Sequence, residues 1–146
     1  MGARRPGGVA VLIKRGLDIV VEQELPNSNG WSIVLKTLMK DKRYLLANIY
    51  GPNKDAEAVR FYQNLSATLR KMDPRSDNNI VVGGDFNCPL NPTLDKKGRI
   101  LFPRQHVINL IENVQNEFSL HDIWRIKIQT PVASHGAKTT LLFFVD

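Results

Sequence analysis

The chain has 146 residues, a formal net charge of +6 and a sequence pI near 9.7, and 42% of its residues are hydrophobic. These values suit one soluble globular domain and exclude a disordered tail; no apolar run is long enough to span a membrane and no signal peptide opens the chain, so we expect an intracellular protein with no membrane partner. The single cysteine, Cys88, excludes an intrachain disulfide and a cysteine-based zinc site and argues against a disulfide-linked partner, while the basic charge makes nucleic acid a candidate partner.

The N-terminal part of the chain predicts strands. Residues 9–13 form a short apolar run that is typical of a buried strand, and residues 19–23 predict a second one. Residues 26–30 are turn formers. Residues 31–39 alternate in polarity and would reverse through a polar turn into a strand over residues 44–50, which is a hairpin pattern. The face expected to be apolar carries Trp31, Ile33, Leu35 and Met39.

The middle of the chain predicts helices around a strand. Apolar residues recur at spacings of three and four over residues 56–72, and Asp55 would cap this helix. The apolar positions are Ala58, Phe61, Tyr62, Leu65, Leu69 and Met72. Residues 79–83 predict a strand buried on both faces, and a second helix is expected from about residue 103 to 118. Its apolar stripe contains Val107, Ile108, Ile111, Val114 and Phe118. This order of elements is typical of a layered α/β domain.

Both ends of the chain resemble sheet strands without neighbours. The apolar run at residues 141–145 stops one residue before the C-terminus, and no strand precedes residues 9–13. Natural folds usually cover such edges. We therefore interpret residues 1–146 as one partial domain, cut at both ends, and expect a marginally stable chain that is prone to aggregation.

The strongest local motif lies at the end of the predicted strand and reads Val82-Gly83-Gly84-Asp85-Phe86-Asn87. Positions i and i+2 of an extended chain share a face, so Asp85 and Asn87 would project together while Phe86 packs inward. The carboxyl ends of strands are where α/β sheets place ligands. A tight turn whose Asp and Asn bind nearby amides explains these residues about equally well.

A second motif, Asn48-Ile49-Tyr50-Gly51-Pro52-Asn53, also joins a strand end to a rigid turn. The Tyr50 phenol can donate a hydrogen bond to a phosphate or its attacking water, and Asn53 offers both a donor and an acceptor. Taken alone, the pattern is more often a turn with a packed tyrosine at its edge.

Together with residues 8–13 and Leu120-His121-Asp122-Ile123-Trp124-Arg125, the two motifs resemble the endonuclease/exonuclease/phosphatase family. The likeness is greatest to the apurinic-endonuclease-like domains of non-LTR retrotransposons. It covers about residues 8–125 and leaves a divergent tail at 126–146. It implies a four-layered α/β sandwich, two mixed β-sheets packed face to face and flanked by helices, that uses Mg²⁺ to hydrolyse phosphodiester or phosphomonoester bonds.

The resemblance also implies roles for individual residues. Tyr50 would contact the phosphate or the nucleophile, Asp85 would orient and deprotonate the attacking water, and Asn87 would hold the water or the metal-bound phosphate. Asn53 would close the tyrosine motif as a substrate-binding residue. Asp85 or Asn87 would be the metal contacts that this chain retains.

Two further parts of the family's site have no counterpart in the sequence. The principal metal ligand of the family is a glutamate on an early strand, and Glu22 and Glu24 lie in a different context. The family ends in a serine-aspartate-histidine motif, whereas Ser134-His135 lacks the intervening aspartate. The basic residues Lys96, Lys97, Arg99 and Arg104 could follow a nucleic-acid backbone, although such a run is usually a solvated surface.

We therefore expect part of a Mg²⁺-dependent endonuclease that nicks DNA, weak or inactive in this chain because a cooperative catalytic set loses most of its rate when one member is missing. A retroelement origin would imply a nuclear location and a parent protein fused to a reverse transcriptase. One alternative is a phosphomonoesterase of the same fold with a small phosphorylated substrate. Another is a non-catalytic, decayed fragment that binds nucleic acid through its charge alone.

Overall fold

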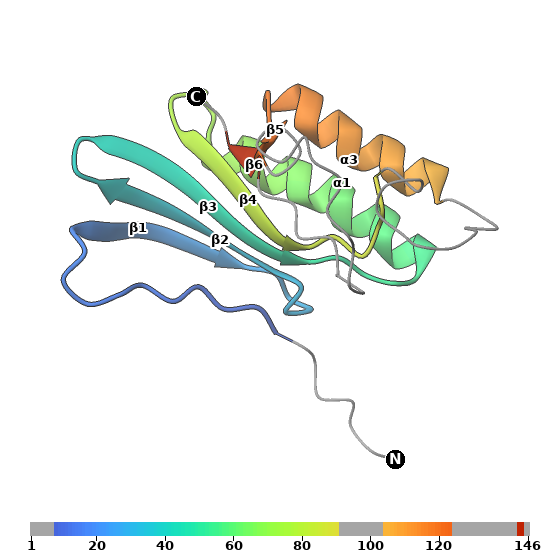
Figure 1. The fold of residues 1–146 in the computed structure, drawn as a ribbon, viewed down its shortest axis with the longest axis horizontal. Helices are drawn as coiled ribbons and strands as arrows, with labels where there is room; N and C mark the ends of the chain where they lie inside the picture. Colours follow the sequence, from blue (N-terminus) through green and yellow to red (C-terminus); the bar gives the residue numbers. More distant parts are fainter. Residues whose placement is uncertain (1–7, 91–103, 124–142, 145–146) are drawn as a thin grey trace, which may run out of the picture.

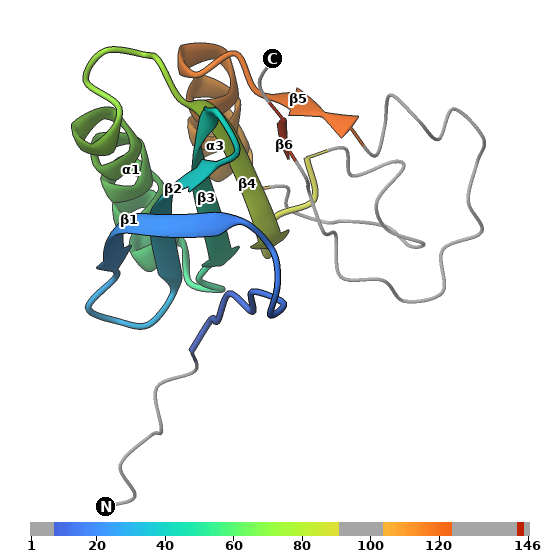
Figure 2. The same cartoon turned by 90° about the vertical axis from the view of Figure 1, so that its left-hand side faces the viewer.

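The computed structural model describes residues 8–90, 104–123 and 143–144. These residues form a mixed sheet with strand order β1-β2-β3-β4-β6-β5, and two helices lie side by side against one of its faces (Figures 1 and 2). The elements are β1 (Ile19–Pro26), β2 (Ser32–Met39), β3 (Lys42–Tyr50), α1 (Asp55–Met72), β4 (Asn79–Asp85), α3 (Gln105–Glu117), β5 (His121–Asp122) and β6 (Phe143–Phe144).

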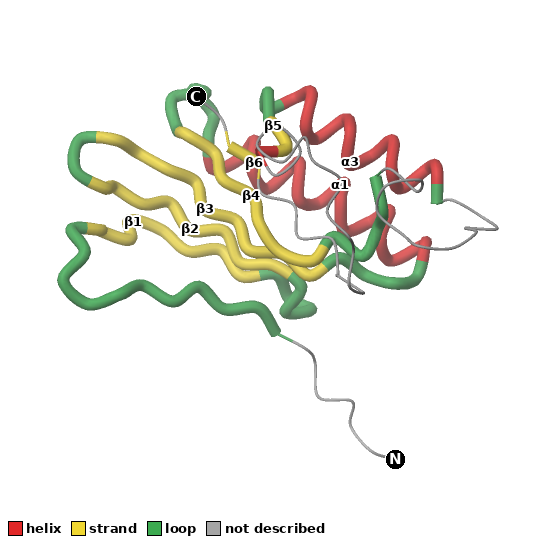
Figure 3. The backbone as a smooth tube through the Cα atoms, in the orientation of Figure 1, coloured by secondary structure: helices red, strands yellow, loops and turns green. Residues whose placement is uncertain are grey.

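The strands β1, β2 and β3 form an antiparallel meander, as the hairpin pattern predicted (Figure 3). The turn between β2 and β3 pairs Met39 with Lys42, and Lys40 takes a positive φ of 54° to close it. The turn before β2 is closed by the Asn27 side chain, whose Oδ1 accepts a hydrogen bond from the Asn29 backbone N–H at 2.9 Å. Both turns therefore use the polar residues from which they were predicted.

The β3-α1-β4 unit places the ends of two strands at the same edge of the sheet. β3 and β4 are parallel, with α1 as the crossover between them. Leu45 and Ala47 of β3 pair with Ile80 and Val82 of β4, and all four side chains are buried. The residues between them in sequence point to the opposite face of the sheet, which carries no helix in Figure 2.

The core lies between the sheet and the two helices. Every apolar position predicted for α1 is buried, and so are the first four predicted for α3, while Phe118 packs against this core with part of its ring exposed. The far ends of the helices are joined by Glu117, which accepts hydrogen bonds from Ser66 at 2.6 Å and from Arg70 at 2.7 Å. The spacing of apolar residues was therefore sufficient to identify the packed face of each helix.

The structure corrects the strand predicted at residues 9–13. This segment is extended but belongs to no sheet, and Leu12 is 93% exposed. The segment is held to the sheet by a hydrogen bond from the Asn48 side chain to the Ala10 carbonyl oxygen, at 2.8 Å. In Figures 1 and 2 the segment lies on the side of the sheet away from the helices. A strand needs the backbone of a neighbouring strand, and within the described residues none pairs with this segment.

Three smaller predictions are also wrong. Asp55 does not cap α1: Lys54 is the N-cap residue and Asp55 is the first residue of the helix. Trp31 does not share a face with Ile33, because its ring packs edge-on against Phe61 of α1 with centroids 6.2 Å apart. β4 is buried at Ile80 and Val82 on its helix-facing side and only half-buried on the other.

The expected second sheet of the sandwich does not lie within the described residues, which hold one sheet and one helical layer. Pro103 and most of residues 141–145 also lie outside them. The described helices include none that is both long and apolar enough to cross a membrane.

Candidate active site at the carboxyl edge of β3 and β4

Tyr50 and Asp85 are the last residues of two neighbouring parallel strands. They are register partners in the β3–β4 ladder. Alternation along each strand turns both side chains toward the face opposite the helices, because Ile49 and Gly84 face the helical layer. Tyr50 is 38% exposed, whereas Asp85 is half-buried and its Oδ2 atom is covered, so an exposed phenol lies next to a partly covered carboxylate at this edge.

The glycines of both motifs permit a close approach of the two loops. Gly84 has a φ of +130°, a conformation that side-chain-bearing residues rarely adopt, and a Cβ there would collide with the Ile49 carbonyl group. A Cβ on Gly51 would collide with the Phe86 carbonyl oxygen and come within 2.6 Å of the Tyr62 hydroxyl oxygen. Any larger residue at either position would therefore push Tyr50 and Asp85 out of register.

Asn87 ties the two loops together. Its side-chain nitrogen donates to the Gly51 carbonyl oxygen at 2.6 Å, and its backbone N–H donates to Asp85 Oδ1 at 2.9 Å. Its φ of 47° lies in the left-handed region, which asparagine tolerates better than most residues. β4 ends at Asp85, so Asp85 and Asn87 are joined by a tight turn rather than projecting from one extended strand as predicted.

The Tyr62 side chain of α1 supports the turn that follows Asp85. Its hydroxyl donates to the Phe86 carbonyl oxygen at 2.6 Å, and its ring stacks on Phe86 with centroids 6.3 Å apart. Burial raises the pKa of Tyr62 well above its usual value, and the nearby Cys88 and Asp85 raise it further against the opposing effect of Arg104. The phenol therefore stays protonated and remains a donor. Phe86 is buried, as predicted.

Two supporting residues were not identified from the sequence. Tyr62 was predicted as a core residue only, although a tyrosine among helix core positions signals a buried phenol that needs an acceptor. Arg104 was grouped with solvated or phosphate-binding residues, but its side chain is 18% exposed and reaches the Pro52 and Asn87 carbonyl oxygens. Nothing in the local sequence distinguishes it from the other basic residues near it.

The remaining predicted site residues fall elsewhere. Asn53 is exposed in the turn before α1, beside the carboxyl edge of β3. Glu22 and Glu24 belong to β1, and Glu22 pairs with Arg43 at 3.4 Å. Lys96, Lys97, Arg99 and Ser134-His135 lie outside the described residues.

The described residues do not make a magnesium site by themselves. Mg²⁺ prefers six oxygen ligands and is usually held by one or two carboxylates together with waters and phosphate oxygens. Asp85 supplies one carboxylate at the edge, and in the part of the chain that the structure describes no three histidine, cysteine or acidic side chains gather closely enough to hold a metal.

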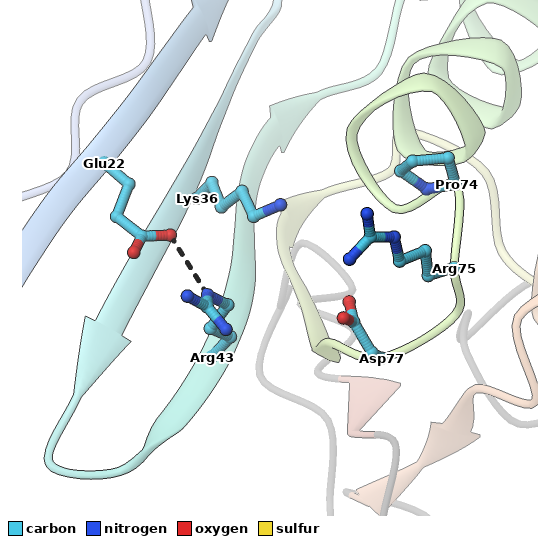
Figure 4. A pocket seen from close by; sticks show the side chains of 6 residues that line it. All are labelled: Glu22, Lys36, Arg43, Pro74, Arg75 and Asp77. Carbon is cyan, nitrogen blue, oxygen red and sulfur yellow. Dashed lines mark ion pairs between the residues drawn. The ribbon is translucent and has the colours of Figure 1, made fainter.

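A hollow of about 380 Å³ lies at the other end of the sheet. Figure 4 shows side chains from β1, β2, β3 and the α1–β4 loop around it: Glu22, Lys36, Arg43, Pro74, Arg75 and Asp77. The hollow contains both acidic and basic groups and is remote from Tyr50 and Asp85, because it lies where α1 ends and β4 begins. It is therefore separate from the candidate active site.

A solved structure has an architecture similar to that of this chain. The endonuclease domain of TRAS1, a telomere-specific non-LTR retrotransposon, superposes with a TM-score of 0.57 over 92% of this chain, at 17% sequence identity. The chain has the fold of a retrotransposon endonuclease domain. This confirms the α/β fold class and the resemblance drawn from the motifs. The chain spans 58% of the TRAS1 endonuclease domain.

A relative of this chain is also found among transposon proteins. The transposon TX1 uncharacterized 149 kDa protein of Xenopus laevis is 34% identical over 97 residues, which are 66% of this chain and 7% of that protein. Truncated Caenorhabditis elegans TDP2 is more distant, with 12% identity and a TM-score of 0.49 over 90% of this chain and 55% of its own. No protein-family model matches the chain.

Proposed function

We propose that this chain forms part of a phosphodiesterase domain that nicks DNA, with Tyr50 and Asp85 at its reacting centre. The observation that carries the proposal is the pairing of these two residues, in register, at the carboxyl edge of parallel strands. The similarity to a transposon protein supports a retroelement context with DNA as substrate. We further propose that the parent protein carries a reverse transcriptase and acts in the nucleus.

The side chains fit in-line hydrolysis of a phosphodiester. Attack by water places negative charge on the nonbridging oxygens, where the Tyr50 phenol can donate a hydrogen bond. The Asp85 carboxylate can accept the proton of the attacking water. One N–H of the Asn87 amide is used by the Gly51 carbonyl, which leaves the second N–H for the phosphate or its water. In this scheme Asn53 contacts the DNA from the neighbouring turn.

Magnesium dependence belongs to the proposal and rests on the family resemblance. Within the described residues a single carboxylate lies at this edge, and we therefore expect weak metal binding and weak or absent nicking. A phosphomonoesterase of the same fold would share Tyr50 and Asp85. We favour DNA because the curated relative is a transposon protein and the chain has a net charge of +6.

The test is nicking of supercoiled plasmid by the purified chain at high enzyme concentration in Mg²⁺. We expect at most slow nicking, lost in Asp85→Ala and on chelation, and retained in Asp41→Ala, which removes an exposed acid from the β2–β3 turn. Hydrolysis of a soluble phosphomonoester without DNA binding would favour the phosphatase. DNA retention that salt abolishes, with no cleavage and no effect of Asp85→Ala, would favour binding by charge alone.

A further inference from the structure

Arg104 joins three separate segments at the edge of the candidate site. It is the N-cap residue of α3, and its Nε donates to Asp55 Oδ1 at 2.6 Å. Its Nη1 donates to the Asn87 carbonyl oxygen at 2.9 Å, and Nη1 and Nη2 both lie 3.4 Å from the Pro52 carbonyl oxygen. One guanidinium thus contacts the start of α1, the loop after Tyr50 and the turn after Asp85.

These contacts complete a set of hydrogen bonds to the backbone of both loops. The Gly51 N–H donates to the Asp85 carbonyl oxygen and the Tyr62 hydroxyl donates to the Phe86 carbonyl oxygen, both at 2.6 Å. The Gly51 carbonyl is bound by the Asn87 amide. Arg104 binds the remaining pair, one carbonyl from each loop, and it does so from an element outside both.

Arginine suits this position because of its planar fork of donors. Five N–H groups in a fixed geometry can bind acceptors on several sides, whereas a lysine ammonium is a compact point charge. Asp55 provides the compensating negative charge at 2.6 Å. The guanidinium is therefore committed to the protein, unlike a surface arginine that would bind a DNA phosphate.

We propose that Arg104 is a positioning residue that holds the Tyr50 loop and the Asp85 turn at a fixed separation. The inference that this separation serves catalysis rests on the proposed function. The hydrogen bonds from Arg104 to the two loops, called the clamp below, are a property of the fold. They can be tested without any measurement of activity.

Cys88 reports on the clamp directly. It is the single cysteine of the chain, follows Asn87 and is 2% exposed, so a thiol reagent reaches it only when the turn opens. Hydrogen bonds from charged groups commonly contribute a factor of about 10 to 100 in an equilibrium constant. We therefore expect Arg104→Ala to label at Cys88 at least about tenfold faster than the native chain, after correction for global unfolding measured on the same samples.

The matched control is Arg70→Ala. Arg70 also bridges α1 and α3, through Glu117 at the far ends of the helices, and does not contact either loop. It should leave the labelling of Cys88 unchanged. Millimolar guanidinium chloride should slow the labelling of Arg104→Ala, while potassium chloride at the same concentration should not. Equal labelling of Arg104→Ala and the native chain, or equal acceleration by Arg70→Ala, would overturn the clamp. Arg104→Lys keeps the positive charge but loses the planar fork of donors, so Cys88 should be labelled faster in this variant as well. It replaces Arg104→Ala in the test if Arg104→Ala does not fold.

The salt dependence of duplex binding separates positioning from phosphate contact. Removing an arginine that binds a phosphate lowers the slope of log affinity against log salt by about 1. Arg104→Ala should keep the native slope, because its charge is already paired with Asp55. A reduced slope would overturn the assignment. Failure of the native chain to bind DNA would instead count against the proposed function, while Cys88 labelling would still decide the clamp.

Discussion

The buried phenol of Tyr62 offers a sharp test of how the candidate site is supported. Tyr62→Phe keeps the ring, which is 1% exposed and packs against Phe61 and Phe86, and removes only the hydroxyl that donates to the Phe86 carbonyl oxygen at 2.6 Å. Loss of a buried hydrogen bond that leaves its acceptor in place costs about 1 to 2 kcal/mol. For a chain of this size that corresponds to a melting temperature lower by roughly 3 to 6 °C.

Tyr62 also predicts how the stability of the folded chain changes at high pH. The pKa of Tyr62 is raised above 10.0 in the folded chain, so its stabilising effect is complete below pH 10 and is lost as the unfolded chain deprotonates at higher pH. Urea unfolding followed by circular dichroism at pH 7 and pH 11 measures both effects. We expect Tyr62→Phe to be less stable than the native chain at pH 7 and the gap to narrow at pH 11. Tyr44→Phe, on the other face of the sheet, is the control. Equal stability of Tyr62→Phe and the native chain at pH 7, or the same difference at both pH values, would show that the Tyr62 hydroxyl does not stabilise the fold through this hydrogen bond.

Other substitutions test separate features of the fold. Gly84→Ala should cost on the order of 3 kcal/mol or prevent folding, since its Cβ meets the Ile49 carbonyl, whereas Gly8→Ala should be silent in thermal melts because its Cβ meets open space. Glu117→Gln should cost no more than about 1 kcal/mol at neutral pH. Burial raises the pKa of Glu117, but hydrogen bonds from Ser66 and Arg70 outweigh this and lower it below 4.5. In urea titrations the difference should therefore shrink as the pH falls below 4.5 and disappear below the lowered pKa of the folded chain. Leu12→Ser should reduce aggregation measured by light scattering and leave the melt unchanged, as Leu12 is 93% exposed.

The sequence was informative where local periodicity and tertiary burial agree. The apolar positions of α1 and α3 and the hairpin before them follow from spacing and turn residues alone. Residues 9–13 show where that reasoning fails: an apolar run indicates burial, but a strand also requires a neighbour, and a neighbour is not a property of the run itself.

The candidate site also contains residues that the sequence identified and residues that it did not. The motifs located Tyr50 and Asp85, and the parallel register of β3 and β4 explains why strand ends separated by a helix meet. Arg104 and Tyr62 act through backbone carbonyls contributed by distant segments. Such bonds depend on tertiary placement and leave no sequence spacing to detect, so only the structure identified these residues.

Duplex binding in the presence of chelator tests, without requiring catalysis, whether a DNA phosphate lies between Tyr50 and Asp85 as we propose. A carboxylate beside a phosphate repels it, so Asp85→Asn should tighten binding by roughly tenfold at low salt, well beyond the effect of Asp41→Asn, which changes the net charge equally in an exposed turn. Tyr50→Phe should weaken binding through loss of the phenol donor. Equal effects of Asp85→Asn and Asp41→Asn, together with no effect of Tyr50→Phe, would show that the phosphate does not lie at this edge.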